Sequence, residues 1–268
     1  MNINEMIDIY MEDGLTRELA AARVCQDVVL KAISIGPLNR NVTIKGGVVM
    51  RSITNNNRRA TRDIDLDFIH YSISDESIRL FVEKLNCIDG LNIAITSDIK
   101  ELKHQDYHGK SIEVLITDES GSSISSKIDI GVHKDLDVEQ EEYCFDVCMD
   151  ENGASLLKNT VEQSFTEKLR SLLIFGSNSR RYKDIYDMYY QKTVAKRDKL
   201  LNLIDHYILS DPGMRENTMG EIITRVSNTF RDKQYLKRVD SSRQRWVDDD
   251  INEIADAIVK YLSDFNVL

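Results

Sequence analysis

Residues 59–68, RATRDIDLDF, decide how the rest of the chain is interpreted. The side chains of a strand alternate between its two faces, so Asp63, Asp65 and Asp67 share one face and the apolar residues between them share the other. Three neighbouring carboxylates repel one another unless a cation lies between them. A divalent cation such as Mg²⁺ binds carboxylate and phosphate oxygens together. The stretch therefore indicates either a metal-binding strand or an edge strand with a solvated acidic face.

Two observations favour the metal-binding interpretation. Asp is disfavoured in strands, so a strand that carries three of them needs a compensating interaction. Farther along, residues 126–132 read SKIDIGV, which places Asp129 alone between two isoleucines. A half-buried acid in a β-branched strand needs a partner. A metal ion shared by Asp63, Asp65 and Asp129 would supply it.

A glycine pair precedes the acidic strand. Lys45, Gly46 and Gly47 follow a short apolar run and lead into VVM, the start of an expected helix. Glycines at a strand-to-helix turn let backbone amides approach a phosphate closely, and the helix N-terminus adds a partial positive charge. A glycine pair alone is usually only a turn. Followed by the acidic strand, it predicts a phosphate site.

Composition excludes several classes of protein. The 268 residues are 41% apolar and 30% charged, with a net charge of -10. No apolar run approaches the roughly 18 residues that a membrane span needs, and Glu5, Asp8 and Glu12 stand where a signal peptide would carry lysines. We expect a soluble, cytoplasmic protein without a membrane partner.

Cysteine and histidine spacing predicts no zinc site and no catalytic dyad. The cysteines are interpreted as reduced and mostly buried: Cys25, Cys87, Cys144 and Cys148. The histidines are interpreted as structural or surface residues: His70, His104, His108, His133 and His206.

Hydrophobic periodicity divides the chain into an α/β (α+β) part with one mixed sheet, residues 1–152, and a helical bundle, residues 153–268. The opening 35 residues are helical, with a break at Gly14. Strands are expected at residues 42–45, 63–69, 91–99, 111–117, 125–132 and 143–147, and helices between them at 47–53 and 75–85, the second capped by Ser74. Later helices are expected at 154–175, 181–191, 196–209, 214–230 and 246–262. Because no linker separates the two parts, we expect them to pack tightly.

Charge is unevenly distributed. Residues 164–245 contain 17 Lys and Arg against 10 Asp and Glu, whereas residues 246–268 contain 1 Lys against 6 acids. Such a pattern is compatible with a metal site beside a surface that binds a polyanion. A solvated helical face rich in Lys and Arg would give the same pattern.

Taken in order, these motifs resemble the DNA polymerase β-like nucleotidyltransferase superfamily. The glycine pair, the run Arg59-x-Thr61-x-Asp63-Ile64-Asp65-Leu66, the later Glu167-Lys168-Leu169-Arg170 and Arg181-x-x-Asp184-x-x-Asp187 are similar to the AbiEii/AbiGii-type nucleotidyltransferase toxins. The resemblance spans about residues 40–190, and the helix after Trp246 also resembles the family's last helix. The interval between Gly47 and Asp63 is longer than the superfamily's usual spacing. The superfamily often has serine where this chain has Gly47, which leaves Arg59 or Thr61 to share the work of holding the triphosphate.

The resemblance implies a chemistry for these residues. Asp63, Asp65 and Asp129 would hold two Mg²⁺ ions, and Lys45, Gly46, Gly47, Arg59, Thr61, Lys168 and Asp184 would contact or support the NTP. Lys168 matches the family's triphosphate-contacting lysine, although on its own it would be interpreted as a surface lysine. Asp184 is expected to position Lys168 or the base, and Asp187 either shares this work or forms an ion pair with Arg180 or Arg181.

The resemblance also implies a biological role. We expect a polymerase β-like domain followed by a helical domain, with the active site in the cleft between them. The enzyme would transfer a nucleoside monophosphate from an NTP to RNA, tRNA being favoured, and so inhibit growth in toxin–antitoxin systems and abortive phage infection, restrained by a cognate antitoxin. The alternatives are nucleotidylation of a protein or small molecule, and a non-catalytic NTP sensor.

Overall fold

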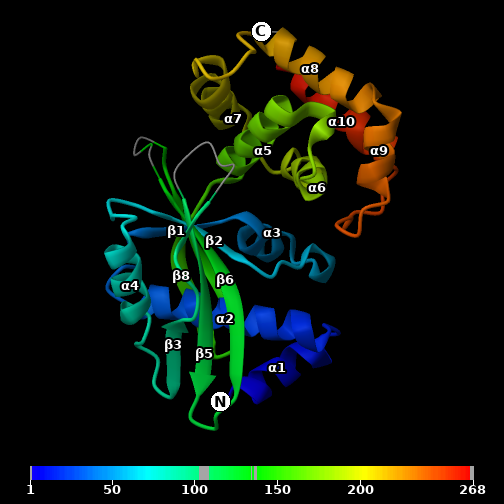
Figure 1. Ribbon diagram of the computed structural model, residues 1–268. Helices are drawn as coiled ribbons and strands as arrows, with labels where there is room; N and C mark the ends of the chain where they lie inside the picture. Colours follow the sequence, from blue (N-terminus) through cyan, green and yellow to red (C-terminus); the bar gives the residue numbers. More distant parts are fainter. Residues whose placement is uncertain (1, 103–108, 134, 136–137, 266–268) are drawn as a thin grey trace. The chain divides into compact units, whose positions relative to one another are not determined.

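The computed structural model describes residues 2–102, 109–133, 135 and 138–265 (Figure 1). The chain forms two compact units, Met1–Asn159 and Thr160–Leu268. The division after Asn159 comes later than the expected one after residue 152, because residues that were expected to begin a helix complete the sheet of the first unit.

Within the described residues, eight strands of the first unit form one mixed sheet in the order β3-β5-β6-β2-β1-β8-β7, with β4 paired to β5. The inner strands β2 and β6 are parallel, as are β1 and β8, whereas β1 is antiparallel to β2. The strands are β1 (Val42–Lys45), β2 (Ile64–Phe68), β3 (Leu91–Ile95), β4 (Lys100–Glu101), β5 (Lys110–Asp118), β6 (Ser123–Val132), β7 (Glu141–Val147) and β8 (Asp150–Lys158).

In the described part of this unit, four α-helices pack with the sheet around one apolar core. They are α1 (Ile3–Glu12), α2 (Arg17–Ile35), α3 (Gly46–Thr54) and α4 (Asp75–Lys84), with a 3₁₀ turn η1 (Asn57–Arg59) before β2. The apolar residues of β2 that alternate with its aspartates are fully buried in this core beside α2 and α4: Ile64, Leu66 and Phe68. The aspartates therefore point to the opposite face of the sheet, as strand alternation predicts.

Most expected elements of the first unit were confirmed, although β3 ends at Ile95 instead of residue 99 and β4 was not predicted. The break at Gly14 separates α1 from α2, and the Ser74 hydroxyl caps α4 by accepting a hydrogen bond from the Ser77 N–H. The expected helix from residue 154 was wrong at its start, because β8 continues to Lys158 and α5 begins only at Val161. The short run ASLL has no strand alternation, and pairing with both β1 and β7 decides its conformation.

The second unit is helical in its described residues, and α5 and α10 contact most of its other helices. Its elements are α5 (Val161–Phe175), η2 (Gly176–Asn178), α6 (Tyr182–Gln191), α7 (Arg197–Ile204), the π turn η3 (Asp205–Leu209), α8 (Met219–Arg231), α9 (Lys233–Asp240) and α10 (Ile251–Ser263). The sequence pattern did not predict α9, and the expected starts of α8 and α10, residues 214 and 246, were too early. No helix in the described ranges has both the length and the apolar composition to cross a membrane.

All four cysteines are free thiols, as expected, but only Cys25 is buried. Cys148 is half-buried, whereas Cys87 and Cys144 are exposed, so the expectation of mostly buried thiols was wrong. Two of the histidines, His104 and His108, lie outside the described residues.

Candidate active site

A row of polar residues crosses the four central strands of the sheet. Asp65 of β2 is paired in register with Lys45 of antiparallel β1 and with Asp129 of parallel β6, and Asp129 is paired with Ser111 of β5. Neighbouring strands lie about 4.8 Å apart, so side chains at paired positions on one face are direct neighbours. The sheet therefore brings together two carboxylates from residues that are 64 positions apart in the chain.

Asp65 occupies an unfavourable place for a negative charge. Burial raises the pKa of its carboxyl group; the charge of Lys45 and the N–H of Gly47, which donates a hydrogen bond to it, act in the opposite direction, while the charges of Asp129 and Asp63 raise the pKa further. The net pKa lies above the ordinary value. Asp65 would therefore gain from a cation beside it.

Asp129 has one satisfied oxygen and one unsatisfied oxygen. Its Oδ2 accepts a hydrogen bond from Lys127 Nζ at 2.7 Å, whereas its Oδ1 is buried and accepts no hydrogen bond from the described residues. Buried carboxylate oxygens are normally hydrogen-bonded or bound to a metal ion. The orphaned Oδ1 is therefore a free ligand atom next to Asp65.

Lys45 and Asp67 form a nearly buried ion pair on the same face, with Nζ 2.6 Å from Oδ1. Asp67 is one side-chain position beyond Asp65 and is 5% exposed. The pair therefore accounts for the third aspartate of the triplet as a structural residue. Because Lys45 pairs with Asp67, it would have to leave this carboxylate to contact an NTP. Its expected contact with the NTP stays a prediction.

The glycine pair packs directly against these carboxylates. Gly46 has φ +64°, and a Cβ added to it would lie 2.1 Å from Asp65 Oδ2. A Cβ on Gly47 would lie 2.4 Å from Thr61 Oγ1. Only glycine fits at both positions. The helix that starts here, α3, has no side-chain cap at its N-terminus. The Gly47 N–H donates a hydrogen bond to Asp65, so an anion would bind the other amides of the first turn.

Arg59 and Thr61 lie in the segment that joins η1 to β2. Arg59 is buried, and Thr61 contacts Gly47 and accepts a hydrogen bond at its carbonyl from Gln26 Nε2 at 2.9 Å. Thr61 also lines a cavity of about 310 Å³ together with Arg51. Thr61 thus borders both the glycine turn and this cavity, whereas the contact of Arg59 with an NTP stays a prediction.

In the second unit, Lys168 belongs to a buried polar cluster. Its Nζ donates a hydrogen bond to Ser164 Oγ at 2.7 Å and lies 3.9 Å from Asp187 Oδ2. Gln191 Nε2 donates to the same Ser164 oxygen at 2.9 Å, and the indole N–H of Trp246 donates to Asp187 Oδ1 at 3.1 Å. The ammonium group of Lys168 is therefore held in a defined position by α5 and α6.

The two aspartates of α6 have different neighbours. Asp184 Oδ2 lies 2.8 Å from Arg181 Nε, whereas the fully buried Asp187 is the aspartate beside Lys168. In the structure, the aspartate beside Lys168 is Asp187, which lies one turn after Asp184 on the same helix. The expectation that Asp184 positions Lys168 stays a prediction.

The carboxylates fit a divalent cation as a pair. Among the described residues, no three Asp, Glu, His or Cys side chains lie close enough together to form a ready-made metal site. The expected trio is therefore incomplete: Asp63 lies exposed just before β2, although its charge acts on Asp65. Mg²⁺ commonly takes one or two carboxylates and completes its ligands with water and substrate phosphates. Asp65 and the free Oδ1 of Asp129 suit such a site.

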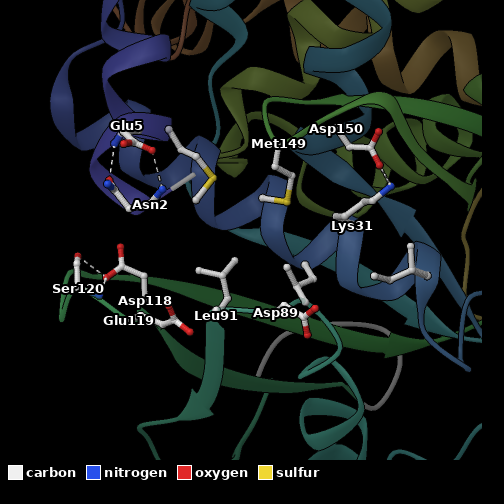
Figure 2. A pocket seen from close by; sticks show the side chains of 14 residues that line it. Asn2, Glu5, Lys31, Asp89, Leu91, Asp118, Glu119, Ser120, Met149 and Asp150 are labelled. Atoms are coloured by element: carbon white, nitrogen blue, oxygen red, sulfur yellow. Dashed lines mark hydrogen bonds and ion pairs between the residues drawn. The ribbon is translucent and has the colours of Figure 1, made fainter.

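A larger cavity, about 620 Å³, is lined in part by the turn that joins β5 to β6 (Figure 2). Five acids line it, Glu5, Asp89, Asp118, Glu119 and Asp150, and its single lysine, Lys31, pairs with Asp150. An acidic lining repels a triphosphate, so this cavity does not suit the expected substrate.

Sequence reasoning missed four residues of these two clusters: Lys127, Ser164, Gln191 and Trp246. Lys127 could have been found, because it lies two positions before Asp129 and therefore shares its face of the strand. Ser164 and Gln191 could also have been found, because each lies four positions from Lys168 or Asp187 on the same helix face. Trp246 reaches Asp187 only through helix packing in the second unit.

Three comparisons relate the chain to known proteins. The family model described as "Nucleotidyl transferase AbiEii toxin, Type IV TA system" matches residues 28–264. A search of curated proteins finds no match. Among solved structures, an antigenic nucleotidyltransferase-like protein from Paracoccidioides brasiliensis is similar over 80% of this chain and 92% of its own, at 14% identity and a TM-score of 0.45. The antibiotic-resistance factor ANT(2'')-Ia is similar over 69% and 92%, at 15% identity and a TM-score of 0.43.

The family match covers most of the chain, including the glycine turn, both carboxylate strands and the Lys168 cluster. The mixed sheet with one polar face is the fold expected from the motifs, and the family's chemistry is nucleotidyl transfer. The chain therefore belongs to the AbiEii family of nucleotidyltransferase toxins of type IV toxin–antitoxin systems.

Proposed function

We propose that this protein transfers a nucleoside monophosphate from an NTP to an RNA acceptor, tRNA being favoured, in a reaction that depends on Mg²⁺. The transfer inhibits growth, and a cognate antitoxin counteracts it. The family match supports the nucleotidyl transfer, the NTP and the antitoxin. The acceptor, the metal dependence and the growth inhibition are the parts that this proposal adds.

The observation that carries the proposal is the pairing of Asp65 with Asp129 beside the glycine turn. Their strands are parallel and in register, one buried carboxylate oxygen has no hydrogen-bond donor among the described residues, and the N-terminus of α3 starts within contact of Asp65. An acidic strand that served only for solvation would keep its carboxylates exposed and its glycines replaceable. Here both glycines are needed to leave room for the side chains of Asp65 and Thr61.

Each residue of the site has a part in the proposed reaction. Asp65 and Asp129 hold Mg²⁺, with Asp63 available as a further ligand, and two ions are expected as in the family. Bound Mg²⁺ supplies a Lewis acid that offsets the charge of the triphosphate and lowers the pKa of the acceptor hydroxyl. The first amides of α3 and the side chain of Thr61 orient the phosphates. The hydroxyl oxygen attacks the α-phosphorus in line, and the bond to the leaving pyrophosphate breaks.

Lys168 is assigned to the triphosphate by the family resemblance. Its ammonium group would neutralise charge on the leaving pyrophosphate. The hydrogen bond from Lys168 to Ser164 and the nearby Asp187 support this assignment, because they hold the ammonium group in one place before a substrate arrives.

The RNA acceptor is supported by the charge of one stretch of the second unit. Residues 164–245 have 17 Lys and Arg against 10 Asp and Glu, and several of the basic side chains are exposed, among them Arg180, Arg181 and Arg197. A phosphate backbone is the polyanion that such a surface binds.

Incubation of the purified protein with total RNA and each of the four α-labelled NTPs tests the proposal. We expect one or more NTPs to label RNA, and EDTA to abolish the labelling. Label on protein instead of RNA would show that the acceptor is a protein. Absence of labelled RNA and labelled protein under every NTP would contradict the transfer.

A further inference from the structure

Lys127 of β6 has no part in the function proposed above, yet it contacts the candidate metal site directly. Its Nζ lies 2.7 Å from Asp129 Oδ2, on the same face of the strand. The Lys127 side chain is 41% exposed, whereas that of Asp129 is 15% exposed. The ammonium group thus approaches Asp129 from the side that is exposed to solvent.

The charge of Lys127 interacts with the whole carboxylate group. Besides Asp129, both Asp63 and Asp65 lie close enough to act electrostatically on its ammonium group. These are the same three carboxylates that are proposed to hold Mg²⁺. In the metal-free protein, Lys127 is therefore the cation that compensates them at the open side of the site.

Lys127 differs in this respect from Lys45, another lysine on this face. Lys45 pairs with Asp67, and both side chains are almost buried, at 11% and 7% exposure. Such a pair is part of the folded structure and is costly to open. Lys127 has a flexible four-carbon side chain that is 41% exposed, so its ammonium group can move from Asp129 into solvent or to another partner.

We infer that Lys127 is a resident counter-ion: it occupies the cation position at Asp129 in the free protein and moves to a phosphate of the NTP when metal and NTP bind together. This inference rests on the proposed function for the identity of the metal ligands. A divalent cation at Asp129 would repel an ammonium group that contacts the same carboxylate. The triphosphate brings the negative charge that the displaced lysine needs.

Two consequences follow for binding. Metal alone must compete with Lys127, so the free protein binds it weakly. Metal bound to an NTP brings a new partner for Lys127, so this complex binds well. Lys127 therefore couples the binding of metal to the binding of the NTP.

Binding of Mn²⁺ alone, followed by electron paramagnetic resonance of the free ion, tests the inference. We compare the wild type with Lys127→Met, Lys127→Gln and Lys127→Arg. The control is Lys31→Met, which removes a lysine paired with Asp150 at the other end of the same sheet (Figure 2). Thermal unfolding checks that each variant is folded.

Lys127→Met and Lys127→Gln should bind Mn²⁺ about tenfold or more tightly than the wild type, because one positive charge beside the ligand is gone. Lys127→Arg and Lys31→Met should stay near the wild type. In calorimetry with Mg²⁺ and an NTP, Lys127→Met and Lys127→Gln should bind the NTP more weakly than the wild type does. If Lys127 had a merely structural role, its replacement would not raise the affinity for metal.

Unchanged or weaker Mn²⁺ binding by both Lys127→Met and Lys127→Gln would overturn the inference. If Asp129→Asn still lowers Mn²⁺ affinity in that case, the metal site stands and only the role of Lys127 fails. If neither the wild type nor any variant binds Mn²⁺, with or without an NTP, the proposed function fails together with the inference.

Discussion

Asp65 and Asp67 lie on one face of one strand, yet their carboxylates have opposite effects on folding. Burial and the charges of Asp129 and Asp63 disfavour the ionised Asp65, whereas Asp67 compensates the nearly buried Lys45. Replacement of each aspartate by asparagine therefore distinguishes the two roles: Asp65 is proposed to bind metal, and Asp67 stabilises the fold.

Asp65→Asn should not destabilise the metal-free protein. The substitution removes a repelled charge, and the asparagine oxygen can still accept the hydrogen bond from Gly47. We expect the midpoint of thermal unfolding in EDTA to be equal to or higher than that of the wild type. A clear decrease would show that the ionised carboxylate stabilises the fold.

Asp67→Asn should lower the free energy of unfolding by about 1–3 kcal/mol, because it removes the carboxylate 2.6 Å from the nearly buried ammonium group of Lys45, while the charge of Asp65 still acts on that group. Urea unfolding measures the difference. A loss below about 1 kcal/mol, the value typical of an exposed pair, would mean that Lys45 finds solvent or another partner.

At the scale of elements, the turn from β1 into α3 places the glycine pair against Asp65. Gly46→Ala puts a methyl group where Asp65 Oδ2 lies, so the carboxylate must move. We expect the transfer rate to fall by about 10²-fold or more, since displacement of one positioned catalytic group commonly costs this much. Gly121→Ala is the matched control, because Gly121 also has a positive φ but no atom within 4 Å of the added Cβ. Equal losses in both variants would assign the effect to backbone strain alone.

The helices α5 and α6 hold Lys168, whose assigned partner is the triphosphate. Lys168→Ala should weaken binding of an NTP with Mg²⁺ markedly in calorimetry, because a positioned positive charge is lost. Lys192→Ala is the control, since Lys192 is also in the second unit and lies over the ring of Tyr189. Equal affinity of Lys168→Ala and the wild type would remove Lys168 from the phosphate site.

Sequence patterns predicted the helices and strands that are marked by their own residues, such as an alternating apolar pattern or a capping residue. Alternation gave the faces of β2 and β6, and a capping serine marked the start of α4. The pattern failed at β8, whose conformation is decided by two neighbouring strands, and at α9, a helix of eight residues.

The candidate site likewise contains residues that the sequence predicted and contacts that it did not predict. The motif spacing pointed to Asp65 and Asp129, but their pairing in register depends on the order of the strands. Likewise, Trp246 lies 59 positions from Asp187, and only packing of the second unit joins them. Spacing reports which residues share a strand or helix face, not which faces meet.

At the scale of the whole molecule, an acidic first unit and a basic stretch in the second give the protein an uneven charge. If the basic stretch binds RNA, log affinity should fall linearly with log salt, with a slope of about 0.7–0.9 per phosphate contacted. Filter binding at several salt concentrations measures this slope. Replacement of Arg180 and Arg197 by alanine should reduce it by about one to two units. A slope near zero for the wild type would rule out the phosphate backbone as the main contact.

The carboxylates paired across β2 and β6 are proposed to catalyse nucleotidyl transfer. The most direct measurement is the rate at which label from an α-labelled NTP reaches RNA, compared among the wild type, Asp65→Asn, Asp129→Asn and the control Asp118→Asn, whose carboxylate caps a hairpin at the other end of the sheet. We predict losses of several orders of magnitude in the two site variants, with folded protein in both, and a rate near that of the wild type in the control. A near wild-type rate in Asp65→Asn or Asp129→Asn would contradict the account.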